Sequence, residues 1–116
     1  MKDLIKVTKA LSDPGRVKII KLLQYRRLCV CELQAALGLA QSTVSKHLKI
    51  LEEAGLIRFT KDGTWVNYEL ELDSDNVYAR AMLKELETWL ENEAEVIELK
   101  KRLPEIQRDI ITKLNR

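Results

Sequence analysis

The sequence predicts a mainly α-helical protein with one small β-hairpin. Apolar residues recur at helical spacing over most of the 116 residues. Two of the expected helices are followed by glycines, Gly38 and Gly55, which readily adopt the left-handed conformation in which helices often end. The pattern changes to strand-like alternation on both sides of Asp62-Gly63, a dipeptide typical of tight hairpins. Two short helices that meet at a glycine turn and precede a hairpin indicate a winged helix-turn-helix.

The first two helices are expected over residues 3–11 and 14–24. Ser12 and Asp13 separate them, and Pro14 suits the first position of the second helix because its missing N–H would have no intrahelical partner there. The apolar residues of the first helix are Leu4, Val7 and Leu11, and those of the second are Val17, Ile20, Leu22 and Leu23.

The helix-turn-helix is expected over residues 29–54. Its first helix covers residues 29–37, and its second runs from about residue 41 to residue 54. Two strands, residues 56–61 and 64–70, then form the wing. The apolar face of the second helix consists of Val44, Leu48 and Leu51.

The helical pattern returns from residue 74 onward, and Pro104 is expected to break or kink it. The stripe of apolar residues on this segment is too continuous for a helix that stands alone. We expect it to pack, together with Leu4 and Val7, against a second copy of the chain, with packing inside one copy as the alternative. The stripe consists of Tyr78, Met82, Leu86, Trp89 and Leu90, and a final amphipathic helix contributes Ile106, Ile110 and Leu114.

The net charge of +2 conceals an asymmetry between the two halves of the chain. Residues 1–64 contain twelve Lys and Arg against six Asp and Glu, whereas residues 69–116 contain eight against twelve. The first half is therefore suited to attract phosphate groups. No run of about 18 apolar residues predicts a membrane span, and the N-terminus lacks the apolar core of a signal peptide. We expect a cytoplasmic protein with no membrane partner.

The helix expected over residues 41–54 has a polar and basic face opposite its apolar face. A recognition helix needs both, because one face packs on the core and the other enters the major groove. Gln can bind adenine, Ser and Thr can bind bases or phosphates, and Lys favours guanine or phosphate. An ordinary solvated face is the alternative, although the adjoining turn and hairpin favour DNA binding. His47, the only histidine, is interpreted as a hydrogen-bonded structural residue rather than a metal ligand. The DNA-binding candidates are Gln41, Ser42, Thr43, Ser45, Lys46 and Lys49 on the helix and Arg58 and Lys61 on the wing.

One domain is therefore expected over residues 1–116. Residues 12–70 would form the DNA-binding core, and residues 75–116 would form the dimerisation and C-terminal helices. A dimer would place two recognition helices roughly 34 Å apart, one turn of DNA, and would bind a near-palindromic double-stranded site.

Three segments resemble the ArsR/SmtB family: Leu-Ser-Asp-Pro-Gly-Arg at residues 11–16, Leu-Cys-Val-Cys-Glu-Leu at 28–33, and Gln-Ser-Thr-Val-Ser-Lys-His-Leu at 41–48 with its continuation to residue 56. The resemblance covers residues 4 to about 90. It implies a homodimeric winged helix-turn-helix repressor that releases DNA on binding a metal or metalloid ion.

The Cys-Val-Cys box is similar to that of arsenic-responsive members of the family. This implies that Cys29 and Cys31 are the ligands, that As(III) or Sb(III) is the inducer, and that no cofactor is bound constitutively. Two departures stand out. Gln34 lies where these members often have a third cysteine, and Ala40 lies where Ser commonly caps the recognition helix.

The physical chemistry of Cys29 and Cys31 gives further expectations. Residues two apart in a regular helix point about 200° apart, so binding one ion would have to unwind the first turn of the helix. The helix N-terminus and the adjacent Arg26 and Arg27 favour thiolates, which prefer soft ions. Two sulfurs are too few for a tetrahedral zinc site, and trivalent arsenic would need a third ligand. Mercury(II), copper(I), a redox signal and simple packing remain alternatives.

The sequence does not support an enzyme. The Cys-x-Cys spacing without a surrounding βαβ pattern does not favour a thiol oxidoreductase. No P-loop, no Ser/His/Asp set and no carboxylate–histidine metal cluster is present. We therefore expect no small organic substrate, and a protein-interaction module built on the C-terminal helices is the remaining alternative.

Overall fold

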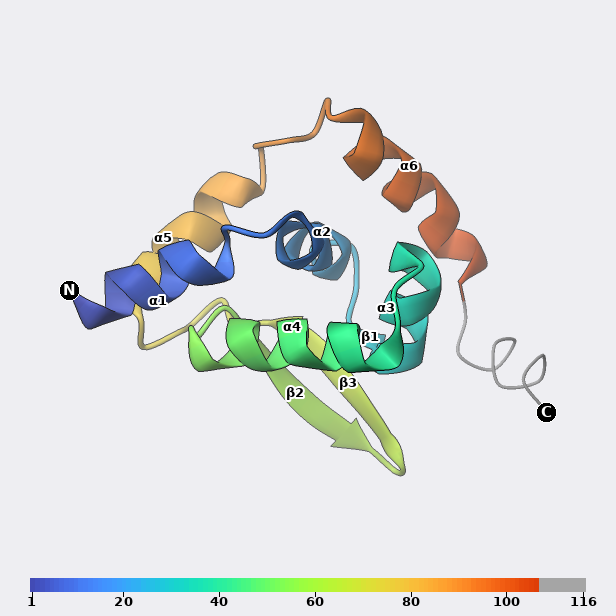
Figure 1. Cartoon of the computed structure of the whole chain (residues 1–116), viewed down its shortest axis with the longest axis horizontal. Helices are drawn as coiled ribbons and strands as arrows, with labels where there is room; N and C mark the ends of the chain where they lie inside the picture. Colours follow the sequence, from blue (N-terminus) through green and yellow to red (C-terminus); the bar gives the residue numbers. More distant parts are fainter. Residues whose placement is uncertain (107–116) are drawn as a thin grey trace.

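The computed structural model describes residues 1–106. The helices and strands follow one another as Figure 1 shows. Of the expected final helix, only Ile106 is described, and Ile110 and Leu114 lie outside the described residues. The elements are α1 (Lys2–Ala10), α2 (Pro14–Leu23), β1 (Leu28–Cys29), α3 (Val30–Leu37), α4 (Gln41–Glu53), β2 (Ile57–Asp62), β3 (Trp65–Leu70), α5 (Val77–Leu86), α6 (Ala94–Arg102) and the 3₁₀ turn η1 (Leu103–Glu105).

Helix α2 lies at the centre of the molecule, with α3, α4, α6 and β3 packed around it. Its start follows the expectation, because Pro14 occupies the first helical turn and the Asp13 side chain accepts a hydrogen bond from the Arg16 backbone N–H at 3.2 Å. The core around α2 includes Val7, Ala10, Ile19, Ile20, Leu22, Leu28, Leu33, Val44, Leu48, Leu51, Leu56 and Leu83.

The helix-turn-helix is formed by α3 and α4, as predicted. Gly38 ends α3 with φ 68°, the left-handed conformation expected there. Helix α4 follows two residues later and buries Val44, Leu48 and Leu51 completely or almost so. Ala40 provides no side-chain cap to α4, as its replacement of a capping Ser implied.

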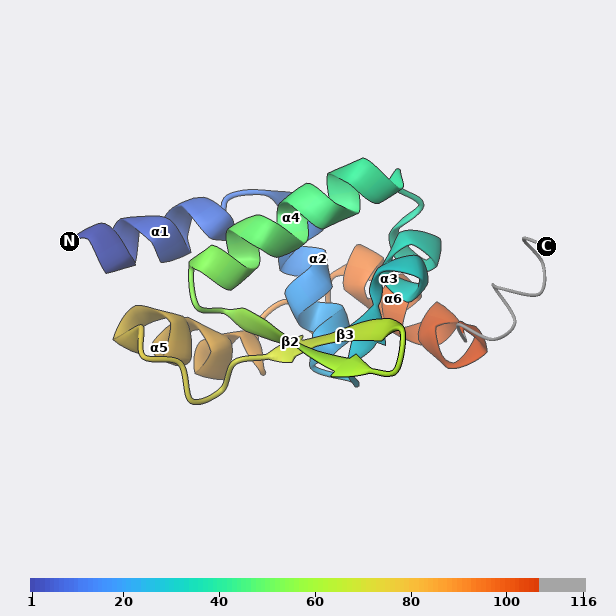
Figure 2. The ribbon, with the colours of Figure 1, turned by 90° about the horizontal axis from the view of Figure 1, so that it is seen from below.

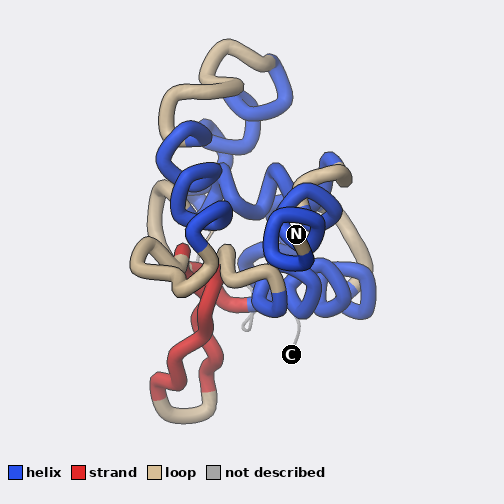
Figure 3. Tube along the Cα trace, turned by 90° about the vertical axis from the view of Figure 1, so that its left-hand side faces the viewer, coloured by secondary structure: helices blue, strands red, loops and turns tan. Residues whose placement is uncertain are grey.

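The wing is an antiparallel hairpin of β2 and β3 that projects from the helices (Figure 3). Gly63, in the turn, has φ 63°. The sequence did not predict β1, which pairs with β3 and gives the order β1-β3-β2. A strand of two residues is too short to leave a periodic pattern, and it changes the surroundings of Cys29, which pairs with Asn67.

The C-terminal segment differs from the single apolar stripe that the sequence predicted. Helix α5 ends at Leu86, and Leu90 has φ 68°, which no helix continues through. Trp89 and Leu90 therefore lie in the connection to α6. Lys21, only 1% exposed, stabilises this connection by donating to the carbonyl oxygens of Leu86 at 2.7 Å and Trp89 at 2.9 Å.

The two C-terminal helices lie at opposite ends of the molecule. Helix α5 packs against α1, whereas α6 packs against α2 and α3 (Figures 1 and 2). Val7 and Leu86, which the sequence assigned to a dimer surface, are buried inside the single chain, because α1 and α5 pack on its own core. The exposed members of that set are Leu4, Tyr78, Trp89 and Leu90, with Met82 half-buried. In residues 1–106 no helix is long and apolar enough to cross a membrane.

Candidate DNA-binding surface and thiol site

The outer face of α4 presents the polar and basic residues that the sequence singled out. Figure 2 shows α4 running along the surface of the molecule above the hairpin. Thr43 is half-buried, so it contributes less surface than its neighbours. The exposed residues of this face are Gln41, Ser42, Ser45, Lys46 and Lys49.

His47 lies on the inner flank of α4 and is bonded to the start of α2. Its Nδ1 lies 3.3 Å from Arg16 Nη1, and its Nε2 lies 3.6 Å from Asp13 Oδ2. Arg16 also donates from Nε to the Ala10 carbonyl oxygen at 2.7 Å, at the end of α1. The three residues therefore connect α1, α2 and α4, which agrees with the structural role expected for His47.

The two basic candidates on the wing differ in their surroundings. Arg58 Nε donates to Glu69 Oε1 at 2.8 Å, across the β2–β3 pair. Its side chain remains 56% exposed, so the pair is a surface salt bridge that phosphate can compete for. Lys61 is exposed near the tip of the hairpin.

Cys29 and Cys31 come together although they are only two residues apart. Their sulfur atoms lie 2.9 Å from each other, and both are free thiols. The expectation that the first helical turn must unwind is wrong, because Cys29 is not helical. It belongs to β1, with φ −87° and ψ 171°, and immediately precedes α3, which Cys31 joins. The extended backbone turns the Cys29 side chain to the same side as Cys31.

The thiol of Cys29 is not activated, in contrast to the expectation from the helix N-terminus and the arginines. Burial, and then the hydrogen bond with Cys31, raise the pKa of Cys29 to about 12. Arg26 does not offset this effect, because it donates to Glu32 Oε2 at 3.0 Å. The other carboxylate oxygen of Glu32 accepts the Cys29 backbone N–H at 3.0 Å. Cys29 is therefore a neutral thiol at neutral pH.

Both thiols open onto a hollow of about 270 Å³, which we call the cysteine hollow. It lies where α3, the first residue of α4 and the wing meet. The sequence analysis placed Gln41 on the DNA side and gave no role to Trp65 or Val66. No local signal could have joined them to the cysteines, since the pairing of β1 with β3 produces the juxtaposition. The lining residues are Cys29, Val30, Cys31, Gln34, Gln41, Trp65 and Val66.

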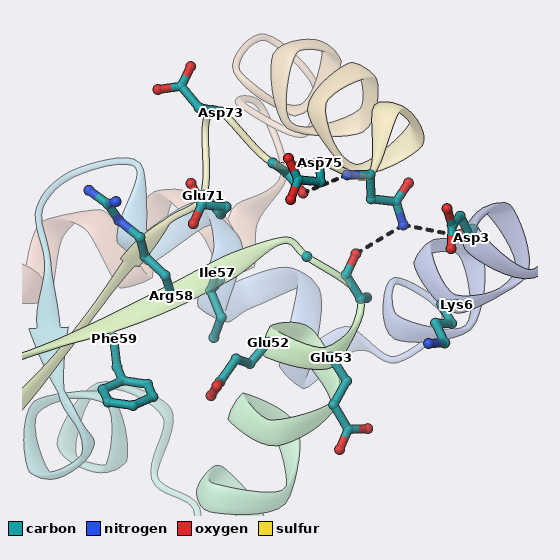
Figure 4. Close-up of a pocket in the computed structure, with 14 residues that line it drawn as sticks. Asp3, Lys6, Glu52, Glu53, Ile57, Arg58, Phe59, Glu71, Asp73 and Asp75 are labelled. Carbon is teal, nitrogen blue, oxygen red and sulfur yellow. Dashed lines mark hydrogen bonds between the residues drawn. The ribbon is translucent and has the colours of Figure 1, made fainter.

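A second hollow, of about 540 Å³, lies at the other end of α4 (Figure 4). Its lining is strongly acidic, although Asp73 and Glu53 lie at opposite edges of it. Asn76 closes the base by donating from Nδ2 to the carbonyl oxygens of Asp3 and Ala54. Within residues 1–106 no group of three or more His, Cys, Asp or Glu is arranged to hold a metal ion. Lys6 and Arg58 are the basic residues of this lining, at the trailing end of α4.

Comparison with known proteins assigns the chain to a family. Residues 13–58 match the family described as "Bacterial regulatory protein, arsR family". The chain is also 38% identical over 93 residues to the arsenic resistance transcriptional regulator ArsR1 of Pseudomonas putida KT2440, an alignment that covers 76% of this chain and 72% of the relative. The chain belongs to the arsR family.

Two further comparisons concern a curated relative and a solved structure. The arsenical resistance operon repressor of Escherichia coli K12 is 43% identical over 67 residues, and the chain spans 57% of its length. The homodimeric winged helix-turn-helix DNA-binding domain of Mb0332 from Mycobacterium bovis has a TM-score of 0.64 and 26% identity, with 74% of this chain and 76% of that one covered. The likeness to this solved winged helix-turn-helix domain confirms the predicted fold class. The family and its arsenical repressor relative are described as regulators of transcription, not as enzymes.

Proposed function

We propose that the chain is a homodimeric repressor that releases a near-palindromic operator when a trivalent arsenical, As(III) or Sb(III), binds Cys29 and Cys31. The observation that carries this proposal is the position of the two thiols. They converge on a hollow that is also lined by Gln41, the first residue of α4, and by Trp65 of the wing. The proposed sensor thiols, the first residue of α4 and the first residue of β3 therefore line the same hollow.

DNA binding is assigned to residues 12–70. The exposed face of α4 offers Gln41 at its leading end for base contact and Lys46 and Lys49 for guanine or phosphate. Lys61 and Arg58 extend the positive surface along the wing. Glu52 and Glu53 lie at the trailing end of α4, where phosphate contact is not needed.

Dimer formation is assigned to α1 and α5. These helices pack side by side, and their outer surface exposes Leu4, Ile5 and Tyr78, each 39–41% accessible in the single chain. In a two-fold dimer the same surface of each copy contacts the other, so a second copy would cover these side chains with its own α1 and α5. The solved domain from Mycobacterium bovis is homodimeric, which supports a homodimer for this chain.

Release of DNA would follow from a change in the spacing of the two sulfurs. A trivalent arsenic bonded to both sulfurs would set their spacing by its own pyramidal bond angles, and we expect that spacing to exceed the 2.9 Å between the two free thiols. An ion would therefore separate β1 from the first turn of α3. Because α3 supports α4, the bound state would favour a different position of the recognition helix.

The test is fluorescence anisotropy of the reduced protein on DNA from upstream of its own gene, with and without arsenite. We expect arsenite to release the DNA, and Cys29→Ser and Cys31→Ser to bind DNA without responding. Release that persists in both variants would overturn the thiol site. If peroxide, mercury(II) or copper(I) releases the DNA and arsenite does not, the chain is still a repressor, but its inducer is not a trivalent arsenical.

A further inference from the structure

The two cysteines satisfy only two of the three bonds that trivalent arsenic forms. The chain contains no other cysteine. The next position on the same helix face, one turn beyond Cys31, is Gln34, which lines the cysteine hollow with an amide instead of a thiol. If the proposed thiol site is correct, the third bond of the arsenic must therefore go to something other than a cysteine of the same chain.

The space beside the sulfurs is larger than an ion with a hydroxide requires. The cysteine hollow measures about 270 Å³, whereas a dry cavity of about 150 Å³ holds a benzene molecule. Val30 and Val66 provide aliphatic wall and Trp65 an indole, all of them only partly exposed. The hollow thus has an apolar wall next to a two-sulfur site.

We propose that the cysteine hollow binds a monosubstituted trivalent arsenical, with arsenic joined to Cys29 and Cys31 and its organic group packed against Trp65, Val30 and Val66. Such a compound needs two sulfurs and no more, because carbon occupies its third bond. The inference rests on the proposed thiol site and specifies which class of arsenical that site prefers.

The chemistry of binding is a ligand exchange without oxidation or reduction. In R–As(OH)₂, two As–O bonds break and two As–S bonds form. Each departing hydroxide takes a thiol proton and leaves as water, so arsenic stays trivalent and the charge is unchanged. The exchange therefore consumes no external acid or base.

The organic group would also take part in DNA release. Gln41 begins α4 and Trp65 begins β3, so a group lodged between them lies against both the recognition helix and the wing. A substituted arsenical would shift these elements by its bulk as well as by separating the sulfurs. Arsenite would act through the sulfurs alone.

The test compares phenylarsine oxide with arsenite on the reduced protein without DNA. The Trp89→Phe background leaves Trp65 as the only tryptophan, so its fluorescence reports the hollow. We expect phenylarsine oxide to change this emission and to bind more tightly than arsenite by a larger factor than the same pair shows on dithiothreitol. A factor equal to that on dithiothreitol would overturn the inference, because the hollow would then add nothing.

Matched variants separate the hollow from the thiols. Trp65→Ala should weaken phenylarsine binding about three- to tenfold relative to arsenite, the cost of one lost aromatic contact. Phe59→Ala, on the neighbouring strand and 46% exposed, should change neither. Gln34→Cys should shift the preference toward arsenite by providing a third sulfur. For these variants, affinities are measured by competition with a dithiol.

The outcomes distinguish the inference from the proposed function. If neither arsenical binds in a way that Cys29→Ser and Cys31→Ser abolish, the thiol site itself fails. If arsenite binds and releases DNA while Trp65→Ala leaves the preference between the two arsenicals unchanged, only the role of the hollow fails.

Discussion

At the scale of single residues, Glu91 is the charge that fixes the start of α6. One carboxylate oxygen accepts a hydrogen bond from buried Lys21 at 2.8 Å and the other from Lys100 at 2.5 Å. The hydrogen bonds from Lys100 and Lys21 lower the pKa of Glu91 to about 2. Since Lys21 also holds the end of α5, the ionised form of Glu91 stabilises the whole connection between α5 and α6.

This arrangement predicts a specific dependence of stability on pH. The folded pKa of Glu91 is about 2, below the ordinary value of 4.5. Its stabilising contribution is therefore complete above pH 4.5 and is lost as the pH falls from 4.5 toward 2. Glu91→Gln should lower the free energy of unfolding at pH 7 and flatten its fall below pH 4.5. Urea denaturation at several pH values measures both effects, with Glu95→Gln, an exposed carboxylate near Lys18, as the control.

The lysines of α4 give a second prediction at this scale. Lys46 and Lys49 are exposed on the outer face of the helix. If each contacts a phosphate, Lys46→Ala or Lys49→Ala should reduce the slope of log affinity against log salt concentration by about 0.9. Lys84→Ala, on α5, should leave the slope unchanged. Anisotropy titrations between low and moderate salt measure it, and an unaltered slope in both α4 variants would remove this helix from the DNA contact.

Cys29 shows how far single residues could be predicted from the sequence. The spacing and the resemblance identified the thiol pair, because these depend only on residue identity and order. The conformation of Cys29 depends on β1, whose partner β3 is almost forty residues further along the chain. Helical geometry and nearby arginines therefore predicted separated, activated thiols. Instead, the pairing of Cys29 with Asn67 accompanies adjacent sulfur atoms, and burial raises the pKa of Cys29.

At the scale of elements, glycine ends two helices in the same backbone conformation but in different surroundings. Gly38 has φ 68° and no atom within 4 Å of where a Cβ would be placed. Gly55 has φ 78°, and its Cβ would lie 2.6 Å from Ser74 Oγ. The sequence predicted both helix ends correctly, because a left-handed stop is a local property. The close approach of Ser74 to Gly55 comes from tertiary packing.

The pair of glycines allows strain and crowding to be separated. Gly38→Ala should destabilise the protein by about 1–2 kcal/mol, the cost of a left-handed alanine. Gly55→Ala should cost more, because Ser74 must also move. Chemical denaturation gives both free energies of unfolding. If both variants lose the same free energy of unfolding, the loop containing Ser74 can move away from the new Cβ without destabilising the protein.

The connection between α5 and α6 was the element-level error of the sequence analysis. Tyr78, Met82, Leu86 and Trp89 have helical spacing, so the pattern predicted one continuous stripe. Helix α5 ends at Leu86. Lys21 donates hydrogen bonds to the carbonyl oxygens of Leu86 and Trp89, and Leu90 has a left-handed φ of 68°. Periodicity cannot reveal a lysine sixty-five residues earlier that terminates a helix.

At the scale of the whole molecule, the three surfaces to which we assign functions lie apart from one another. The α1–α5 pair lies at one end, α6 lies at the other, and α4 with the wing faces outward between them (Figures 1 and 2). Arg102 donates to the Ala36 carbonyl oxygen at 2.7 Å, and Arg26 donates to that of Ile106 at 2.6 Å. These bonds hold the C-terminal segment against α3, so α6 covers the helix that we propose as the sensor and leaves the outer surface of α1 and α5 exposed.

This division predicts which apolar surface forms the dimer. Leu4→Glu on α1 or Tyr78→Glu on α5 should weaken self-association more than about tenfold, because an unpaired carboxylate buried in an interface costs at least 1–3 kcal/mol. Ile97→Glu, on α6 and equally exposed at 40%, should leave the dimer intact. Sedimentation equilibrium gives the dissociation constants, and far-ultraviolet circular dichroism checks that each variant is folded. If only Ile97→Glu abolishes the dimer, the interface is formed by α6. In that case α1 and α5 do not set the distance between the two recognition helices.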